Sequence, residues 1–251
     1  SGLPYCLIAV ISVNESGNHL NTHLHCGGVM NIETWFTEIP VVTRTYVSAV
    51  VLTTAACTLD LVTPFSLYFS FELIFRGQIW RLITNFLFFG QEFSLDFFFH
   101  VFFLTRYCRG LEERSFRGRT ADFVYMLLLG GICMLLISPI ASLHFLGSSL
   151  TFMMVYVWSR RNQFARMNFL GLFTFSAPYL PWVLLSFSIL LGGSVTVDLI
   201  GIVIGHIYYF CEDVYPNMVS GNTRILKTPR FLQMLFVDDD EEFDVQPFED
   251  Q

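Results

Sequence analysis

The stretch 195–211 constrains the fold more than any other part of this chain. It is an apolar run of nearly span-like length, interrupted by Asp198, Gly201 and Gly205. A Gly-x-x-x-Gly pair in a lipid-embedded helix lets a second helix approach to backbone contact, because no side chain holds it off. A charged carboxylate at the centre of such a helix costs roughly 2.5 to 3.5 kcal/mol on insertion scales. We therefore expect Asp198 to face other helices or a wet cavity, either paired or protonated.

The whole chain has the composition of a membrane protein rather than of a soluble domain. Hydrophobic residues make up 53% of it and charged residues only 14%, whereas soluble domains are nearer a quarter charged. A span-sized window finds six candidate membrane segments, at 46–62, 95–104, 123–143, 145–158, 169–191 and 195–211. The sequence therefore predicts an all-α polytopic membrane protein.

Two of these segments are short for a bilayer. Residues 95–104 and 145–158 cannot cross a hydrocarbon core of ~30 Å without their flanks, so either the bilayer thins locally or neighbouring helices shield them. In the fifth segment, Pro178 and Pro181 are expected to kink the helix, because proline removes a backbone hydrogen bond.

The basic residues predict the orientation of the chain in the membrane. Alternating the segments across the bilayer puts 12 of the 14 lysines and arginines on one side and leaves Arg76 and Arg81 on the other. The positive-inside rule then places both termini in the cytoplasm. The arginines of residues 106–119 lie in a short connection with two glutamates among them, which argues against nucleic-acid binding.

No metal or cofactor motif is present in the sequence. The six cysteines are scattered without paired spacing, so neither a zinc site nor a disulfide framework is indicated. They are Cys6, Cys26, Cys57, Cys108, Cys133 and Cys211.

The connection 63–91 between the first two segments has unusual composition for a loop. It holds bulky apolar residues at roughly helical spacing with few charges, which indicates a helix in the membrane interface, with Trp80 at headgroup level. Arg81 can snorkel, or it can donate hydrogen bonds to backbone carbonyls that fix the loop. An interfacial anchor without further function is the simpler alternative.

Several of these features together resemble a known superfamily. Trp80 and Arg81 followed by Thr84 in the first loop, a six-segment core and Gly-x-x-x-Gly in the last segment resemble the rhomboid superfamily. Within it the chain looks like a derlin. The strings similar to derlins are RGRTADF at 117–123, VYVWSRRN at 155–162, LPWVL at 180–184 and GHIY at 205–208. The resemblance covers about residues 30–229 and is closer to the second and third animal derlins than to the first.

The resemblance also implies that protease chemistry is lost. Rhomboid proteases carry a serine nucleophile in Gly-x-Ser-Gly at the start of the fourth span and a histidine base before two glycines of the sixth. Matching Gly201 and Gly205 to those glycines puts Asp198 at the position of the base. Matching the fourth span puts Gly147 at the position of the nucleophile, or Ser149 after a two-residue shift. The expected protein is a rhomboid-like six-transmembrane-helix bundle without the Ser–His dyad.

Three regions are expected. Residues 1–29 lie outside the resemblance and are predicted to be an N-terminal extension. Residues 30–215 form the membrane domain. Residues 216–251 form a cytoplasmic tail, predicted to be disordered because from residue 238 onward it carries eight acidic residues and no lysine or arginine.

A derlin is implied to be a multi-pass protein of the endoplasmic reticulum membrane that assists retrotranslocation of misfolded proteins for proteasomal degradation. The implied partners are misfolded client proteins, a membrane ubiquitin ligase complex, a valosin-type AAA ATPase, the lipid bilayer and other derlin copies in a homo- or hetero-oligomer. The terminal box with which several derlins recruit the ATPase is not visible here. An active intramembrane serine protease and a structural scaffold of a ligase complex are the alternatives.

Overall fold

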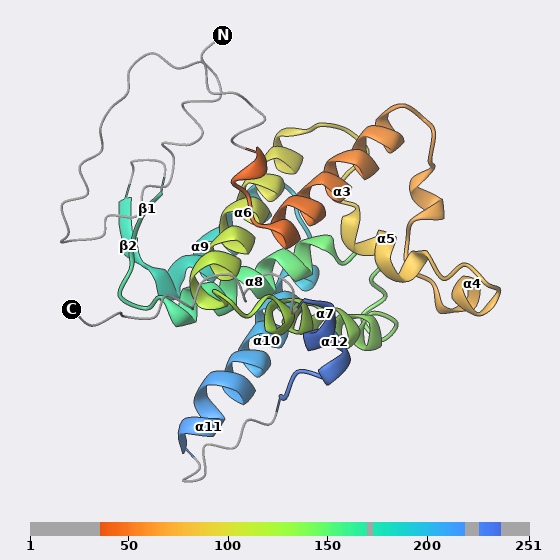
Figure 1. The fold of residues 1–251 in the computed structure, drawn as a ribbon. Coiled ribbons are helices and arrows are strands. Elements are labelled where there is room, and N and C mark those ends of the chain that lie inside the picture. Colours follow the sequence, from red (N-terminus) through yellow and green to blue (C-terminus); the bar gives the residue numbers. More distant parts are fainter. Residues whose placement is uncertain (1–35, 170–172, 219–225, 237–251) are drawn as a thin grey trace, which may run out of the picture.

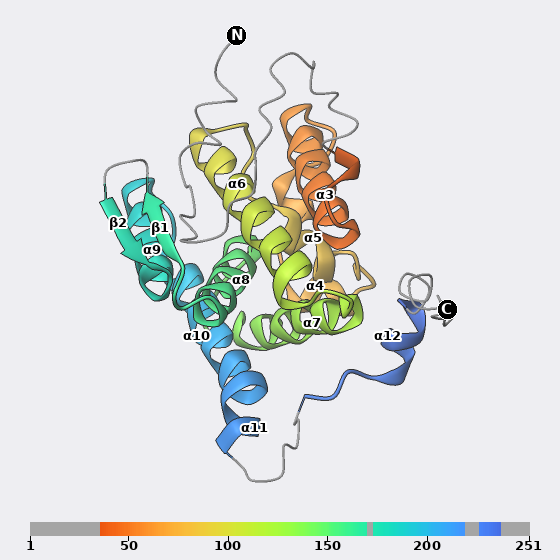
Figure 2. The same ribbon diagram turned by 60° about the vertical axis from the view of Figure 1, so that its left-hand side comes forward.

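The computed structural model describes residues 36–169, 173–218 and 226–236, most of which are helical. The main helices are α3 (Val41–Thr58), α6 (Leu95–Gly110), α7 (Thr120–Ile137), α8 (Gly147–Arg161), α9 (Leu180–Leu190) and α10 (Val195–Tyr209). Helix α8 lies at the centre, with α6 on one side and α10 on the other (Figure 1). Helix α3 packs on α6, while α7 and α9 pack on both α8 and α10 (Figure 2).

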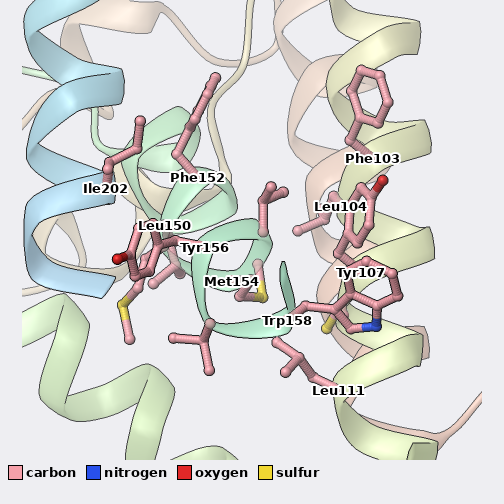
Figure 3. Packing of buried hydrophobic residues seen from close by; sticks show 14 of the residues in the cluster. Phe103, Leu104, Tyr107, Leu111, Leu150, Phe152, Met154, Tyr156, Trp158 and Ile202 are labelled. Carbon is pink, nitrogen blue, oxygen red and sulfur yellow. The ribbon is translucent and has the colours of Figure 1, made fainter. Parts of the chain in front are cut away.

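Helix α8 is buried on all of its sides. Every residue from Ser149 to Ser159 is buried, and the facing helices supply large apolar side chains, among them Tyr107 of α6 and Ile202 of α10 (Figure 3). The Tyr107 ring meets that of Trp158 edge-on, with centroids 5.1 Å apart. A helix enclosed in this way must be apolar around its whole circumference. The hydroxyls of Ser149, Thr151 and Ser159 donate to main-chain carbonyls of α8 itself or of α10, so these three polar groups have partners within the core.

Two glycines of α10 let its backbone approach that of α8. A Cβ atom on Gly205 would lie 3.0 Å from the Cβ of Tyr156 and 3.1 Å from the carbonyl oxygen of Met153. At Gly201 a Cβ would overlap the carbonyl oxygen of Ser149. We call this contact line the glycine seam. It sets both the distance and the register between the two helices.

Three helices in the described part of the chain are long and apolar enough to cross a membrane. They are Val41–Thr58, Thr120–Ile137 and Val195–Met218. The third runs from α10 through a π-helical turn, η4 (Phe210–Val214), into α11 (Tyr215–Met218). The other main helices are shorter. Helix α6 continues to Gly110, well beyond the apolar segment 95–104, because Tyr107 and Cys108 remain buried against the core.

The prediction of a membrane segment at 169–191 is wrong in its first half. Strands β1 (Arg166–Phe169) and β2 (Phe173–Ser176) pair antiparallel there, with Met167 opposite Phe175, so the expectation of an all-α chain is also incorrect in this hairpin. The helix begins only after a short turn, η3 (Ala177–Tyr179). Pro178 and Pro181 therefore lie in the first turns, where no backbone N–H is needed, and start the helix instead of kinking it.

A buried carboxylate joins the arginine-rich connection to the first helix. The connection begins with a π-helical turn, η2 (Leu111–Ser115), that places Glu112 at the start of α3. Its carboxylate accepts hydrogen bonds from the backbone N–H groups of Val42 and Thr43, at 3.0 and 2.9 Å, and from the Thr43 hydroxyl at 2.7 Å. Because these N–H groups have no partner within the helix, Glu112 acts as an N-terminal cap from a distant part of the chain.

The first loop is folded around Arg81. It contains η1 (Pro64–Ser66), α4 (Phe71–Phe75) and α5 (Arg81–Leu87). The guanidinium donates to the carbonyl oxygens of Phe65 and Tyr68, at 2.9 and 2.8 Å, and to the amide oxygen of Gln78 at 2.6 Å. Arg81 is only 5% exposed, whereas the neighbouring Trp80 is 53% exposed. Of the two roles open to Arg81, the structure has the second, in which it fixes the loop backbone.

The described part of the expected tail contains short helices. Helix α11 continues the last apolar helix, and α12 (Arg230–Leu235) packs on α7 through the buried Leu232. Just before α12, the Thr228 hydroxyl donates to the carboxylate of Asp122 in α7. The acidic run from residue 238 and the expected extension 1–29 lie outside the described residues.

The glycine seam predicts a graded effect of added side chains. Gly205→Ala should lower the free energy of unfolding by about 1–3 kcal/mol, as for other overpacked contacts. Gly201→Ala should lower it more, because the new methyl meets a rigid carbonyl, and leucine at either position should be worse than alanine. The midpoint of thermal unfolding in mild detergent measures this. Gly90→Ala is the matched control, since its nearest neighbour would lie at an ordinary 3.7 Å; equal midpoints for all variants would contradict the seam.

The contacts of Arg81 predict that a positive charge alone does not keep the first loop folded. Arg81→Ala leaves two loop carbonyls without their donor, which costs about 1–3 kcal/mol for a buried group. Arg81→Lys should rescue little, because an ammonium lacks the planar fork that reaches both carbonyls and Gln78. Limited proteolysis of the first loop should be faster in both variants. Arg76→Ala, which removes only the exposed pair with Glu72, should cleave at the wild-type rate.

Candidate functional site

A polar cavity lies at one end of the helix bundle. The N-terminal ends of α6, α8 and α10 meet the C-terminal end of α9 there and enclose about 400 Å³. The lining combines aromatic rings with carboxylates, hydroxyls and imidazoles. It consists of Phe88, Phe89, Asp96, His100, Ser142, Leu143, His144, Phe145, Gly147, Ser148, Ser188, Gly193, Ser194, Val197 and Asp198.

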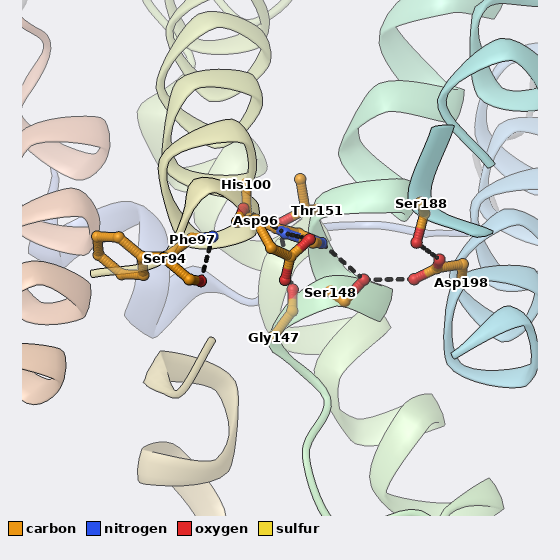
Figure 4. A network of polar contacts seen from close by, with 9 residues as sticks. All are labelled: Ser94, Asp96, Phe97, His100, Gly147, Ser148, Thr151, Ser188 and Asp198. Atoms are coloured by element: carbon orange, nitrogen blue, oxygen red, sulfur yellow. Dashed lines mark hydrogen bonds and ion pairs between the residues drawn. The ribbon is translucent and has the colours of Figure 1, made fainter. Parts of the chain in front are cut away.

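Asp198 is the most buried ionisable group of this cavity. It is 1% exposed, and each of its carboxylate oxygens accepts a hydrogen bond (Figure 4). The Ser188 hydroxyl of α9 donates to one oxygen at 2.5 Å, and the Ser148 hydroxyl of α8 donates to the other. These two donors replace the water that a carboxylate loses on burial, so the expectation that Asp198 faces other helices with a partner is consistent with its surroundings.

The carboxylate of Asp96 and the imidazole of His100 lie on the side of Ser148 away from Asp198 (Figure 4). Nδ1 of His100 lies 3.0 Å from the main-chain oxygen of Asp96 and 3.2 Å from a carboxylate oxygen of the same residue. Both are acceptors, so Nδ1 carries the hydrogen and Nε2 is left as an acceptor. Nε2 lies 3.4 Å from the Ser148 oxygen, at the long limit for a hydrogen bond (Figure 4). The single hydroxyl hydrogen of Ser148 is donated to Asp198 instead.

The two candidate positions for a lost nucleophile have different surroundings. Gly147 lines the cavity, but a Cβ there would lie 2.9 Å from the carbonyl oxygen of Phe86 and 3.0 Å from the Phe89 ring. Ser149 is fully buried and turned away, because its hydroxyl donates to the carbonyl oxygen of Val197 at 2.5 Å. The serine of α8 that lines the cavity is Ser148, which lies between them and was not among the predicted positions.

The other predicted residues lie outside the cavity lining. Trp80 is exposed, whereas Arg81 holds the first loop, in which Phe88 and Phe89 form one wall of the cavity. Gly201 and Gly205 follow Asp198 along α10 and set its distance from α8. Arg81 and the two glycines position the site without forming part of its surface.

Sequence reasoning missed several groups that the fold brings together. Asp96 and His100 are one turn apart in an apolar segment, and ionisable residues there are expected to face a partner or a cavity. This signal would have been sufficient to predict that both residues line the site. Ser148 and Ser188 carry no such signal, since serine is common in membrane helices and bonds readily to its own backbone.

Comparison with known proteins identifies the family. The model of the Der1-like family matches residues 39–230. Derlin-2.2 of Zea mays is 54% identical over 83% of this chain and 87% of its own length. The probable derlin-2 homolog of Dictyostelium discoideum is 47% identical over 81% and 82%, and Derlin-1 of Arabidopsis thaliana is 38% identical over 80% and 76%. The higher identity to proteins named derlin-2 confirms the expected resemblance, and the chain belongs to the Der1-like, or derlin, family.

Proposed function

We propose that this chain is a non-catalytic, rhomboid-like component of endoplasmic-reticulum-associated degradation. In this role it assists the retrotranslocation of misfolded proteins from the endoplasmic reticulum to the cytosol. Family membership supports the general role. The observation that carries the proposal is the polar cavity of about 400 Å³ among apolar helices, because such a cavity offers hydrogen bonds at membrane depth to a chain that has lost its fold.

The proposed topology has six spans, formed by α3, α6, α7, α8, α9 and α10, with both termini in the cytoplasm. This orientation follows from the uneven distribution of lysine and arginine, and it puts the cavity at the lumenal end of the bundle. A misfolded client in the lumen would then meet the cavity first.

Local thinning of the bilayer is proposed beside α9. Helix α8 has 15 residues but is enclosed by protein, so its length need not match the lipid. Helix α9 has 11 residues, about 16 Å at 1.5 Å per residue. It nevertheless exposes Trp182, Ile189 and Leu190 on its outer face. A short helix with an apolar outer face favours a thinner bilayer, which would lower the barrier for a polar chain.

The surroundings of Asp198 support the loss of protease chemistry. The resemblance puts this carboxylate where a rhomboid protease has its histidine base, and both of its oxygens are occupied by serine donors. A hydroxyl that donates to a carboxylate in this way is not held for attack on a substrate. At the other candidate position, Gly147 has no side chain to act as a nucleophile.

One observation favours the alternative of an intramembrane serine protease. Ser148, His100 and Asp96 follow one another in the order of a catalytic triad, with the 3.4 Å distance between Ser148 and His100 as the weak link. A third possibility, a structural scaffold of a ubiquitin ligase complex, would give binding to that complex without movement of clients. In our proposal the ligase complex and the valosin-type AAA ATPase are partners that complete the reaction, and the chain itself has no metal or cofactor.

The non-catalytic proposal predicts no reactive serine. Purified full-length protein in detergent should not be labelled by a fluorophosphonate probe and should not cleave a transmembrane substrate, because the Ser148 hydroxyl is donated to Asp198. Ser149→Ala, at a position outside the cavity lining, should leave client degradation unchanged. Labelling that is lost in Ser148→Ala but kept in Ser149→Ala would instead establish the protease alternative.

The cavity predicts that its polarity, and not only its shape, matters for client movement. Asp198→Leu removes both acceptors and should lengthen client half-life in cells severalfold, with the ligase complex still co-purifying. Asp198→Asn keeps an oxygen acceptor of similar shape and should act more like the wild type. Ser186→Leu, on the exposed outer face of α9, is the control. Wild-type degradation with Asp198→Leu, while ligase binding persists, would support the scaffold.

A further inference from the structure

Helix α10 carries a histidine on its outer surface, at the end opposite the polar cavity. His206 is exposed, and the exposed residues around it, Val203 and Ile207 of α10 and Phe210 at the start of η4, are all apolar. In a spanning helix such a face is turned toward lipid. Polar groups in that position are unfavourable unless they have partners, and they therefore mark a candidate functional site.

The partners of His206 come from α8. The phenol of Tyr156 extends from α8 toward α10 (Figure 3), and its oxygen lies 2.7 Å from Nδ1 of His206. Arg160, one turn further along α8, donates from Nε to the same phenol oxygen at 3.0 Å and stacks over the Tyr156 ring. Three polar side chains are thus joined across the line where the two helices meet.

This network fixes which hydrogens remain available. Arginine can only donate, so the hydroxyl hydrogen of Tyr156 is left to donate to Nδ1 of His206. The remaining hydrogen of the neutral imidazole is then on Nε2. Arg160 donates to this phenol from Nε alone. None of the residues described by the structure forms an ion pair with it. Its neighbour Arg161, by contrast, is paired with Asp213 at 3.0 Å.

The site therefore offers several N–H donors, and the phenol oxygen of Tyr156 that joins them is uncharged. Arg160 is the residue before the last of α8, so its guanidinium lies at the end of the span. The exposed side chains next to His206, the partner of its neighbour Tyr156, are apolar. A phosphate group matches the fork of a guanidinium, and at this depth beside apolar side chains the phosphate of a membrane lipid is the nearest one.

We propose that Arg160 and His206, held by Tyr156, bind the phosphate of an anionic phospholipid, with one acyl chain along Val203 and Ile207. The lipid would lie in the cytoplasmic leaflet if the proposed orientation is correct. The site itself rests only on the membrane position of α8 and α10. It does not depend on the proposed role in degradation.

Native mass spectrometry of the purified full-length protein tests this site. The protein in mild detergent is mixed with equal amounts of phosphatidic acid and phosphatidylcholine, and the bound lipid is counted. We expect the wild type to retain phosphatidic acid preferentially. Arg160→Gln and His206→Leu should each reduce this retention severalfold, while Arg160→Lys, which keeps the charge but not the fork, should lie between them and the wild type.

The matched control separates lipid binding at this site from an effect of the protein's net charge. Arg109→Gln removes the same charge from an arginine that is already paired with Glu113 at 2.7 Å, so it should retain lipid like the wild type. Equal retention in all variants, or an equal loss in Arg109→Gln, would overturn the proposal. Displacement of the lipid by millimolar inorganic phosphate would also overturn it in favour of a soluble anion. Thermal unfolding midpoints of each variant show that a loss of lipid is not a loss of fold.

Discussion

The close approach of α8 and α10 along the glycine seam is the constraint on which the rest of the structure depends. In lipid there is no hydrophobic free energy to gain when apolar side chains exchange contact with acyl chains for contact with one another. Helices therefore associate through close packing and hydrogen bonds. Gly201 and Gly205 allow backbone contact with α8 at Ser149 and Met153. Once that contact is made, the register of every other residue pair along the two helices is fixed.

The cavity around Asp198 and the network around His206 both follow from this register. One turn before the seam, α10 brings Asp198 opposite Ser148, where the cavity opens. One residue after the seam, it brings His206 opposite Tyr156, at the other end of the contact. The two sites therefore lie on a single rigid helix pair, and a change in the packing at the seam would alter both.

Buried charges fix the first loop and the start of α3. Arg81 and Glu112 are both nearly buried, and neither uses its charge for an ion pair in the contacts described above; each binds main-chain groups. Arg81 ties the carbonyls of the first loop together, and Glu112 caps α3. Charged groups can be buried in this way when the main chain supplies several hydrogen bonds to them. The loops are thus fixed without a large apolar core of their own.

The sequence predicted the main helices and the partnering of Asp198, because hydropathy and the cost of a buried charge are local signals. It failed at the start of the segment 169–191, at residues 169 and 173–176, where an apolar run with strand-forming residues cannot be told from a helix by hydropathy alone. The sequence also could not show which serine of α8 lines the cavity. Successive residues of a helix point about 100° apart. Neighbouring Ser148 and Ser149 therefore have opposite roles, and only the packed position of α8 shows which is which.

In our proposal, the site is inert because a carboxylate stands where a protease would have an imidazole. A neutral histidine has one acceptor nitrogen and can hold one serine hydroxyl, which it then activates. A carboxylate has two oxygens, and Asp198 uses them to join Ser148 of α8 to Ser188 of α9. The same position that could serve a reaction in a protease thus becomes a hydrogen-bonded link between helices. In our proposal, the polarity that remains around that link is what a client chain would encounter.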